Sequence, residues 1–283
     1  MTGTHWIFGP AELPDKRGFR VSFDKLQSLK YRALQISLAN ESSFDIDKAE
    51  EVAELNERYH INLSVHAPYS CFITHDRPEM RAKALSSLVA CARLVKTMGG
   101  EFVVFHPGLY QGRTRDKLLK VVGDNLLRLE DMMADEEIEG VTFHAENVSR
   151  HNEFGQLEDI LEIARLSDLM RPCIDWAHVH ACSFGGLKKQ PDFDAVIRKA
   201  LDAIGVADLE NSSFHYADTE HRDGIERQHL EFGEGDPLLR YIIKAVEDAG
   251  LKRCILISEC PGEPSHQRIF TALKKASNKG RFD

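Results

Sequence analysis

The stretch EFVVFHP (101–107) is followed by DKLLKVVGDNLLRLEDMMA (116–134) and then by GVTFHAEN (140–147). The first and last of these stretches are short, apolar and rich in β-branched and aromatic residues, which is typical of buried strands. The long stretch between them has apolar residues at helical spacing. A strand, a helix and a second strand in this order predict a parallel βαβ unit.

The same unit recurs along the whole chain. Strand-like runs lie at 4–9, 33–39, 61–67, 101–107, 140–147, 172–177, 212–218 and 254–259, and helical patterns such as 81–99 and 157–170 lie between them. Eight such units predict an α/β fold that closes into a (β/α)8 TIM barrel. An open, doubly wound sheet is the alternative, but no GxGxxG follows the first strand and no Walker loop occurs. Because we find no linker, we expect residues 1–283 to form a single domain.

Composition limits the class of protein. Of the 283 residues, 42% are hydrophobic and 29% are charged, which suits a globular domain with a large core. The apolar runs are strand-sized and no signal peptide is recognisable, so we expect a cytoplasmic protein with no membrane partner. The six cysteines include no CxxC pair, which predicts reduced thiols. The net charge of -9 argues against steering of the whole molecule to nucleic acid, although a local basic patch remains possible.

Histidines and carboxylates fall at the ends of the expected strands. The positions, each about one βα unit after the previous one, are His66, His106, Glu146, Asp175, His215 and Glu259, with His178 just beyond Asp175. In a barrel the carboxyl ends of the strands converge on one face, where the active sites of this fold lie. Any one of these residues alone is more often a hydrogen-bonded core residue or an ion-pair partner. Six coincident positions predict a metal site, because buried charge is costly unless it is paired or bound to metal.

The ligand types narrow the metal and its chemistry. Imidazole and carboxylate without thiolate suit zinc, manganese or iron. The set exceeds what one tetrahedral ion needs, so we expect two or three ions, with Glu146 as a bridge between two of them. Adjacent ions suit the hydrolysis of phosphate esters, because they stabilise both the attacking and the leaving oxygen.

A set of short motifs carries a family resemblance through nearly the whole chain. They are VHAPY (65–69), VFHPG (104–108), HAEN (144–147), CIDWAH (173–178), FHYAD (214–218), HLEFGEGD (229–236) and ISECPG (257–262). In this order the set resembles the endonuclease IV family of apurinic/apyrimidinic endonucleases (AP endonuclease family 2), within the xylose-isomerase-like TIM barrels. The resemblance implies a monomeric enzyme in which three zinc ions hydrolyse the DNA backbone 5′ to abasic sites, in base excision repair.

The resemblance also implies a role for each residue. The first zinc would take His66, His106 and Glu146; the second would share Glu146 and add Asp175, His215 and Glu259; the third would take His178 and His229. Glu146 would thereby be the central catalytic residue. Tyr69 matches an aromatic residue that the family places against the DNA, with an ordinary rim tyrosine as the alternative.

The sequence departs from the family at three places. Arg227 stands where the family has an aspartate ligand of the third zinc, so Glu226, Glu231 or His180 would have to substitute, or that site would be weak or empty. The loop after the third strand begins His-Ala-Pro-Tyr, and the loop at 40–43 has no basic residue. A sugar isomerase or epimerase on the related barrel is therefore the alternative enzyme, and a non-catalytic, metal-holding barrel is a third possibility. The pair His66 and His106 favours the nuclease.

One further histidine has two interpretations. His144 lies two positions before Glu146, so strand alternation puts both side chains on one side of the sheet. His144 would then either orient a carboxylate of the centre or simply pack in the core.

Overall fold

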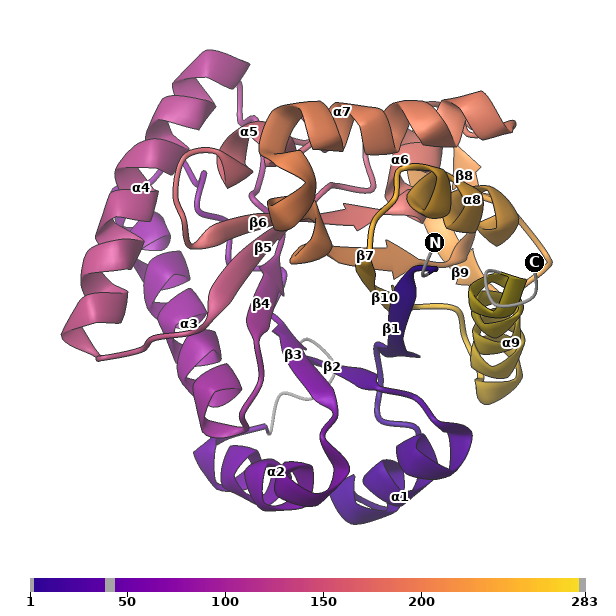
Figure 1. Ribbon diagram of the computed structural model, residues 1–283. Coiled ribbons are helices and arrows are strands. Elements are labelled where there is room, and N and C mark those ends of the chain that lie inside the picture. Colours follow the sequence, from indigo (N-terminus) through magenta and orange to yellow (C-terminus); the bar gives the residue numbers. More distant parts are fainter. Residues whose placement is uncertain (1–2, 39–43, 280–283) are drawn as a thin grey trace.

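A computed structural model describes residues 3–38 and 44–279 of the chain, so the loop at 40–43 lies outside the described residues. Eight strands form one parallel sheet, and each of the eight runs expected from the sequence overlaps one of them (Figure 1). The strands are β1 (His5–Pro10), β2 (Ala33–Ser37), β3 (Asn62–His66), β4 (Phe102–Phe105), β5 (Thr142–Glu146), β6 (Met170–Asp175), β7 (Ser213–Tyr216) and β10 (Arg253–Ser258).

The sheet curls into a nearly closed barrel. Its strand order is β1-β10-β7-β6-β5-β4-β3-β2, so β1 and β2 are the two end strands. These ends meet, because the backbone N–H of Arg32, just before β2, donates to the carbonyl of Phe8 in β1 at 2.8 Å. The prediction of a single-domain (β/α)8 TIM barrel is confirmed, and the open-sheet alternative is wrong.

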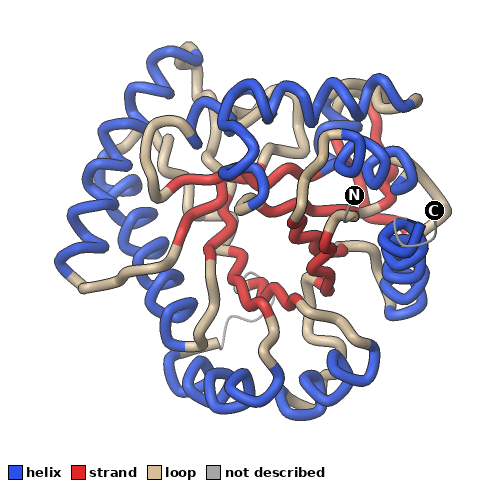
Figure 2. The backbone as a smooth tube through the Cα atoms, in the orientation of Figure 1, coloured by secondary structure: helices blue, strands red, loops and turns tan. Residues whose placement is uncertain are grey.

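Helices surround the barrel (Figure 2). Within the described residues they are α1 (Phe19–Leu29), α2 (Ile46–Tyr59), α3 (Pro78–Thr97), α4 (Arg115–Asp135), α5 (Leu157–Ala164), α6 (Trp176–Cys182), α7 (Gln190–Glu210), α8 (Leu239–Asp248) and α9 (Glu263–Lys279). None of the helices in the described part of the chain is long and apolar enough to cross a membrane. All six cysteines are free thiols, and five of them are buried.

Strand alternation divides the core into two parts. One set of strand residues points outward and joins the helices in a large apolar core. The other set points into the barrel, where a smaller apolar cluster contains Ala33, Phe102, Val104, Cys173, Ile255 and Ile257. Polar residues take the inward positions nearer the carboxyl ends of the strands. The barrel thus has an apolar floor and a polar mouth.

A β-hairpin beyond β7 was not expected from the sequence. The strand expected at 212–218 ends at Tyr216, and the chain then forms the antiparallel pair β8 (Asp218–Arg222) and β9 (Ile225–Leu230). The sequences DTEHR and IERQHL are polar and lack the alternation of a half-buried strand, so no apolar pattern marks them. This hairpin contacts α6 and brings His229 Nε2 within 3.9 Å of Glu259, which directly follows β10.

Candidate metal centre

The residues expected to bind metal lie together at the mouth of the barrel, from six of its strands. Three are the last residues of their strands, two directly follow their strands and one lies within its strand; in chain order they are His66, His106, Glu146, Asp175, His215 and Glu259. Three of them lie two residues after a member of the inner apolar cluster, so strand alternation directs them into the barrel: His106 after Val104, Asp175 after Cys173 and Glu259 after Ile257. The fold therefore gathers three imidazoles and three carboxylates into one buried cluster.

The first group consists of His66, His106 and Glu146. All three are buried, and one ligand atom from each lies within 4.8 Å of the others. Glu146 Oε2 is 2.8 Å from His66 Nε2 and 3.6 Å from His106 Nε2. One carboxylate oxygen therefore faces both rings.

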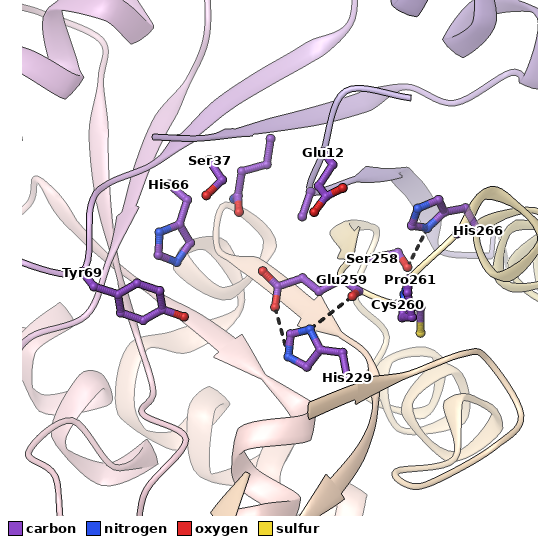
Figure 3. A pocket seen from close by; sticks show the side chains of 13 residues that line it. Glu12, Ser37, His66, Tyr69, His229, Ser258, Glu259, Cys260, Pro261 and His266 are labelled. Carbon is purple, nitrogen blue, oxygen red and sulfur yellow. Dashed lines mark hydrogen bonds and ion pairs between the residues drawn. The ribbon is translucent and has the colours of Figure 1, made fainter. Parts of the chain in front are cut away.

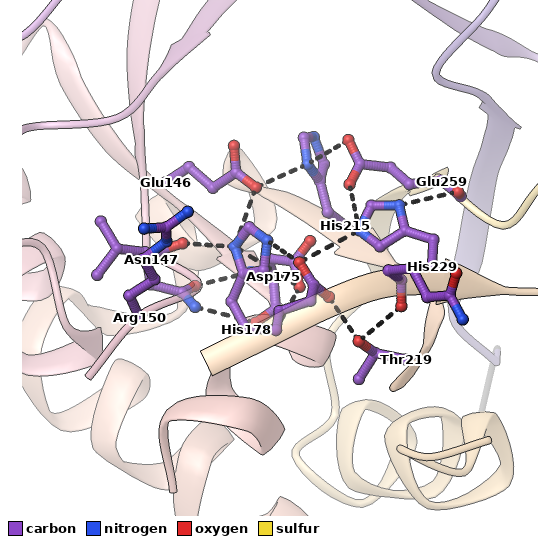
Figure 4. Close-up of polar contacts among 12 residues, drawn as sticks. Glu146, Asn147, Arg150, Asp175, His178, His215, Thr219, His229 and Glu259 are labelled. Atoms are coloured by element: carbon purple, nitrogen blue, oxygen red, sulfur yellow. Dashed lines mark hydrogen bonds and ion pairs between the residues drawn. The ribbon is translucent and has the colours of Figure 1, made fainter. Parts of the chain in front are cut away.

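The second group shares Glu146 and adds Asp175, His215 and Glu259. His215 Nδ1 is 3.2 Å from Glu146 Oε1 and 3.3 Å from Glu259 Oε1 (Figure 4). Ligand atoms of all four residues lie within 4.8 Å of one another. Because the two oxygens of Glu146 face different groups, this side chain has the geometry of a bridging carboxylate.

The third group consists of His178, Glu226 and His229. Glu226 Oε2 lies 3.1 Å from His178 Nε2 and 3.4 Å from His229 Nε2. Thr219 donates to the other oxygen of Glu226 at 2.8 Å. Of the substitutes considered for the position of Arg227, Glu226 has the required placement.

A β-bulge explains why Glu226 takes this place. In the hairpin, Glu220 pairs with Gln228 but His221 pairs with Glu226, so Arg227 is an extra residue without a ladder partner. Residues three apart lie on opposite faces of a regular strand, and one extra residue brings them to the same face. Glu226 and His229 therefore both point toward His178, while Arg227 is exposed.

His178 is held in place by the start of helix α6. Asp175 is the N-cap of this helix, and its Oδ1 accepts from the His178 backbone N–H at 2.8 Å. The His178 ring donates from Nδ1 to the Asn147 carbonyl at 2.7 Å, which turns Nε2 toward Glu226 (Figure 4). A single short turn thus joins the second and third groups.

The electrostatics of the cluster reflect burial and close pairing. Burial alone would raise the pKa of Glu146, but the imidazoles of His106 and His215 hold it well below its usual range. Burial lowers the pKa of His106 to about 3, against the opposing charge of Glu146. Burial raises the pKa of Asp175 to about 6, and the pKa of His229 rises to about 9 because Glu226 and Glu259 outweigh its burial.

The donor set fits divalent cations. Among the described residues, Asp175 Oδ2 and His106 Nδ1 are buried polar atoms without a hydrogen-bonding partner, although Asp175 Oδ1 is used by the helix cap. Cys173 also lies near Glu146 and His215, but burial raises the pKa of its thiol to about 11, which disfavours a thiolate ligand. The centre therefore offers buried imidazole and carboxylate ligands, which suit zinc, manganese or iron.

A pocket of about 460 Å³ opens beside the cluster. His66 and Tyr69 line one side of it, and His229 and Glu259 face them (Figure 3). Tyr69 is 63% exposed and stacks on His106, with ring centroids 5.0 Å apart and planes 11° from parallel. No lysine or arginine is among the described residues that line this pocket.

Some residues considered from the sequence lie elsewhere. His180 and Glu231 belong to none of the candidate groups that the described residues form, and His180 instead contacts His221. Among the described residues His144 has no carboxylate partner: it bonds to Thr142 and Ser213 and stacks on Phe102, so of its two interpretations packing is correct.

Two polar residues at the centre were missed. Asn147 fixes the strand end, since it accepts from the Asp175 backbone N–H at 2.8 Å and donates to its carbonyl at 3.0 Å. Gln35 lies on β2 against His215. A glutamine at an inward position of the apolar run ALQISLA was a signal that could have found it.

The chain matches one protein family over most of its length. The model of the family described as xylose isomerase-like TIM barrel matches residues 23–277. An uncharacterized protein of Methanocaldococcus jannaschii, MJ0133, is 25% identical over 86% of this chain and 87% of that protein. A probable endonuclease 4 of Solibacter usitatus is 28% identical over 63% of each chain.

Solved structures share the fold. A D-tagatose 3-epimerase-like protein superposes with a TM-score of 0.72 at 19% identity, over 97% of this chain and 99% of that one. Endonuclease IV from Thermus thermophilus superposes with a TM-score of 0.71 at 17% identity, over 97% and 98%. At these identities the likeness concerns the barrel and does not separate the two activities.

Proposed function

The chain belongs to the xylose isomerase-like TIM barrel family, and from this membership we propose that it is a metal-dependent phosphodiesterase that hydrolyses the DNA backbone 5′ to abasic sites, in base excision repair. Its partner is then duplex DNA that carries such a site. We expect the active form to be a monomer, and light scattering can measure its molar mass. Relatives named probable endonuclease 4, at 24% to 28% identity, support this choice.

The single observation that carries the proposal is the presence of three adjoining ligand groups. His66 and His106 form one group with Glu146, and His178, Glu226 and His229 form another beside the carboxylate-rich second group. A sugar isomerase needs one or two ions, held mainly by carboxylates. The additional imidazole-rich groups suit a larger centre that surrounds a phosphate.

In this proposal each side chain has a defined task. The ligands are His66, His106, Glu146, Asp175, His178, His215, Glu226, His229 and Glu259. Divalent cations held there would lower the pKa of bound water and neutralise charge on the phosphoryl oxygens. Glu146 divides its two oxygens between the first two groups and so fixes their separation. Tyr69, exposed and stacked on His106, presents a flat face to a base or sugar of the substrate.

Incision of an abasic duplex tests the proposal. The substrate is a duplex with one stable abasic analogue, and the protein is loaded with zinc or with manganese. We expect a single cut 5′ to the lesion by the wild-type protein, and loss of this cut to the level of chelator-treated protein in Glu146→Gln. Glu139→Gln, at an exposed glutamate in the loop before β5, is the matched control and should cut normally. Absence of incision by the wild-type protein, both when it is loaded with zinc and when it is loaded with manganese, would rule out the proposed reaction.

A second candidate, sugar isomerisation or epimerisation, is favoured by the lining of the pocket. Within the described chain that lining offers hydroxyl, amide and carboxylate groups from Ser37, Ser258, Gln35 and Glu12, and no lysine or arginine. Such groups suit a neutral polyol better than a phosphate. Turnover of a ketose by the metal-loaded protein, without incision of DNA, would establish this alternative.

A further inference from the structure

A buried amide lies behind one of the candidate metal ligands. Gln35, on β2, is fully buried, and its Nε2 lies 3.2 Å from His215 Nε2 and 3.5 Å from Ser64 Oγ. Its Oε1 is also buried and has no hydrogen-bonding partner among the described residues. Among the hydrogen bonds of the described residues, this amide is the partner of His215 Nε2, and the Cys173 thiol is a further neighbour of the ring.

The other histidines of the centre are oriented differently. Three of them place Nδ1 on a backbone carbonyl and turn Nε2 inward: His66 on Ala67 at 2.9 Å, His178 on Asn147 at 2.7 Å and His229 on Glu259 at 3.2 Å. A carbonyl only accepts, so each of these rings carries a proton on Nδ1, and in its neutral form the lone pair of Nε2 faces the centre. Their tautomers are fixed by the backbone.

His215 is turned the other way. Its Nδ1 faces the carboxylates of Glu146 and Glu259, and its Nε2 faces Gln35. To offer a lone pair from Nδ1 to a cation, this ring must carry its proton on Nε2. That proton needs an acceptor, and a glutamine amide presents either a donor or an acceptor according to its rotation.

We propose that Gln35 is a positioning residue that sets the tautomer of His215: its carbonyl accepts the Nε2–H and leaves the Nδ1 lone pair for the second metal group. The inference rests on the metal-binding part of the proposed function, and not on the substrate. It concerns a residue that none of the expected ligand sets includes.

Rotation of the amide makes this arrangement favourable. A half turn about the last side-chain bond exchanges Oε1 and Nε2 in space. Oε1 then lies between His215 Nε2–H and the Ser64 hydroxyl, and both can donate to it, which uses its two lone pairs. In the opposite rotation the NH2 group faces His215 Nε2, which suits a ring that carries its proton on Nδ1 and donates to Glu146. Each rotation of the Gln35 amide therefore selects one tautomer of the ring.

Two substitutions at Gln35 separate an accepting from a donating role. Gln35→Met keeps the volume but removes the acceptor, so we expect zinc affinity at one site to fall about 10- to 100-fold. Gln35→Glu can only accept when ionised, so it should bind zinc at least as well as the wild type. Affinity is measured by competition with a chromophoric chelator. Gln190→Met, a similar change on α7, is the matched control.

The tautomer of His215 can also be observed directly, and a purely structural role of Gln35 makes no prediction about it. Two-dimensional ¹⁵N spectra of the zinc-loaded wild type, with the signal assigned by its loss in His215→Gln, should show the proton on Nε2. These spectra are recorded on the wild type, so they do not depend on whether either Gln35 variant folds. Thermal melts of the variants in chelator measure their folding separately.

The outcomes distinguish this inference from the function it rests on. If the wild type binds no zinc, the metal centre itself is wrong, and this inference fails with it. If the wild type binds zinc but His215 carries its proton on Nδ1, or Gln35→Met binds zinc with wild-type affinity, then only the role of Gln35 is overturned. Weak binding by both Gln35→Met and Gln35→Glu, with normal melting, would also overturn the accepting role.

Discussion

Glu226 Oε2 lies 3.1 Å from His178 Nε2, and this contact joins the β8–β9 hairpin to helix α6 at the mouth of the barrel. The pairing is buried: the side chains of His178 and Glu226 are 6% and 10% exposed. Their charges are matched, because Asp175 and Glu226 raise the pKa of His178 well above its usual value despite its burial. The hairpin thus completes the third ligand group.

Replacement of Glu226 tests this role. Glu226→Gln removes the charge that faces His178 and His229, so we expect the weakest zinc site to lose about 10- to 100-fold in affinity while the other sites are kept. Elemental analysis after dialysis measures the number of ions per chain. Arg227→Asp should leave the wild-type zinc content unchanged, because the bulge turns residue 227 outward. Zinc content unaffected by Glu226→Gln, or raised by Arg227→Asp, would contradict the assignment.

Loss of the Tyr69 ring should weaken binding of DNA without altering the metals. Stacking of a base on an aromatic side chain contributes about 1–3 kcal/mol, so Tyr69→Ala should bind an abasic duplex about 5- to 150-fold more weakly. Tyr69→Phe keeps the ring and should stay close to the wild type. Fluorescence anisotropy measures the affinity, and zinc content is the control. Equal affinities for all three proteins would make Tyr69 an ordinary rim residue.

The sequence predicted the barrel, and it predicted that six residues able to bind metal gather at the ends of its strands, because both depend on residue patterns that are visible in a single sequence. An apolar run that ends in His66 or Glu146 indicates both a buried strand and the position of its carboxyl end. The hairpin was not predicted because its strands are polar. The placement of Glu226 was not predicted because it depends on a bulge, and a bulge has no signature in a single sequence. His144 was ambiguous for another reason: alternation gives the side of the sheet, but not the depth in the barrel.

Acid should destabilise the protein in part through His144. This ring is fully buried, and burial holds its pKa well below 6.5 in the folded state, whereas the unfolded chain titrates normally. The folded state therefore binds fewer protons, so the stability linked to His144 is present above pH 6.5 and is lost as the pH falls below it.

Unfolding by urea in the presence of chelator measures this effect. The advantage of the wild type over His144→Gln should shrink below pH 6.5, by up to about 1.4 kcal/mol per pH unit, since one proton is linked. Between pH 7.5 and 8.5 the difference between the two proteins should be constant. Parallel stability curves from pH 7.5 to pH 5 would show that folding leaves the pKa of His144 unchanged, which would contradict this prediction.

Asp218 should control the third ligand group from a distance. It is buried at the junction of β7 and the hairpin, where its carboxylate accepts from the Tyr216 hydroxyl and from the backbone N–H groups of Gly233 and Gly235, at 2.6 and 3.1 Å. Asp218→Asn keeps the shape, but its NH2 group must face one of these donors. Since a buried donor then lacks an acceptor, we expect a loss of about 1–3 kcal/mol in the free energy of unfolding.

The same substitution should loosen the hairpin that carries Glu226 and His229. We therefore expect Asp218→Asn to lower the affinity of the weakest zinc site, although Asp218 belongs to none of the ligand groups formed by the described residues. Asp223→Asn is the matched control: Asp223 is exposed in the hairpin turn at a φ of 54°, which asparagine tolerates well. Urea unfolding and zinc titration of both variants decide the point, because a hairpin positioned independently of Asp218 would keep its zinc affinity even in a destabilised protein.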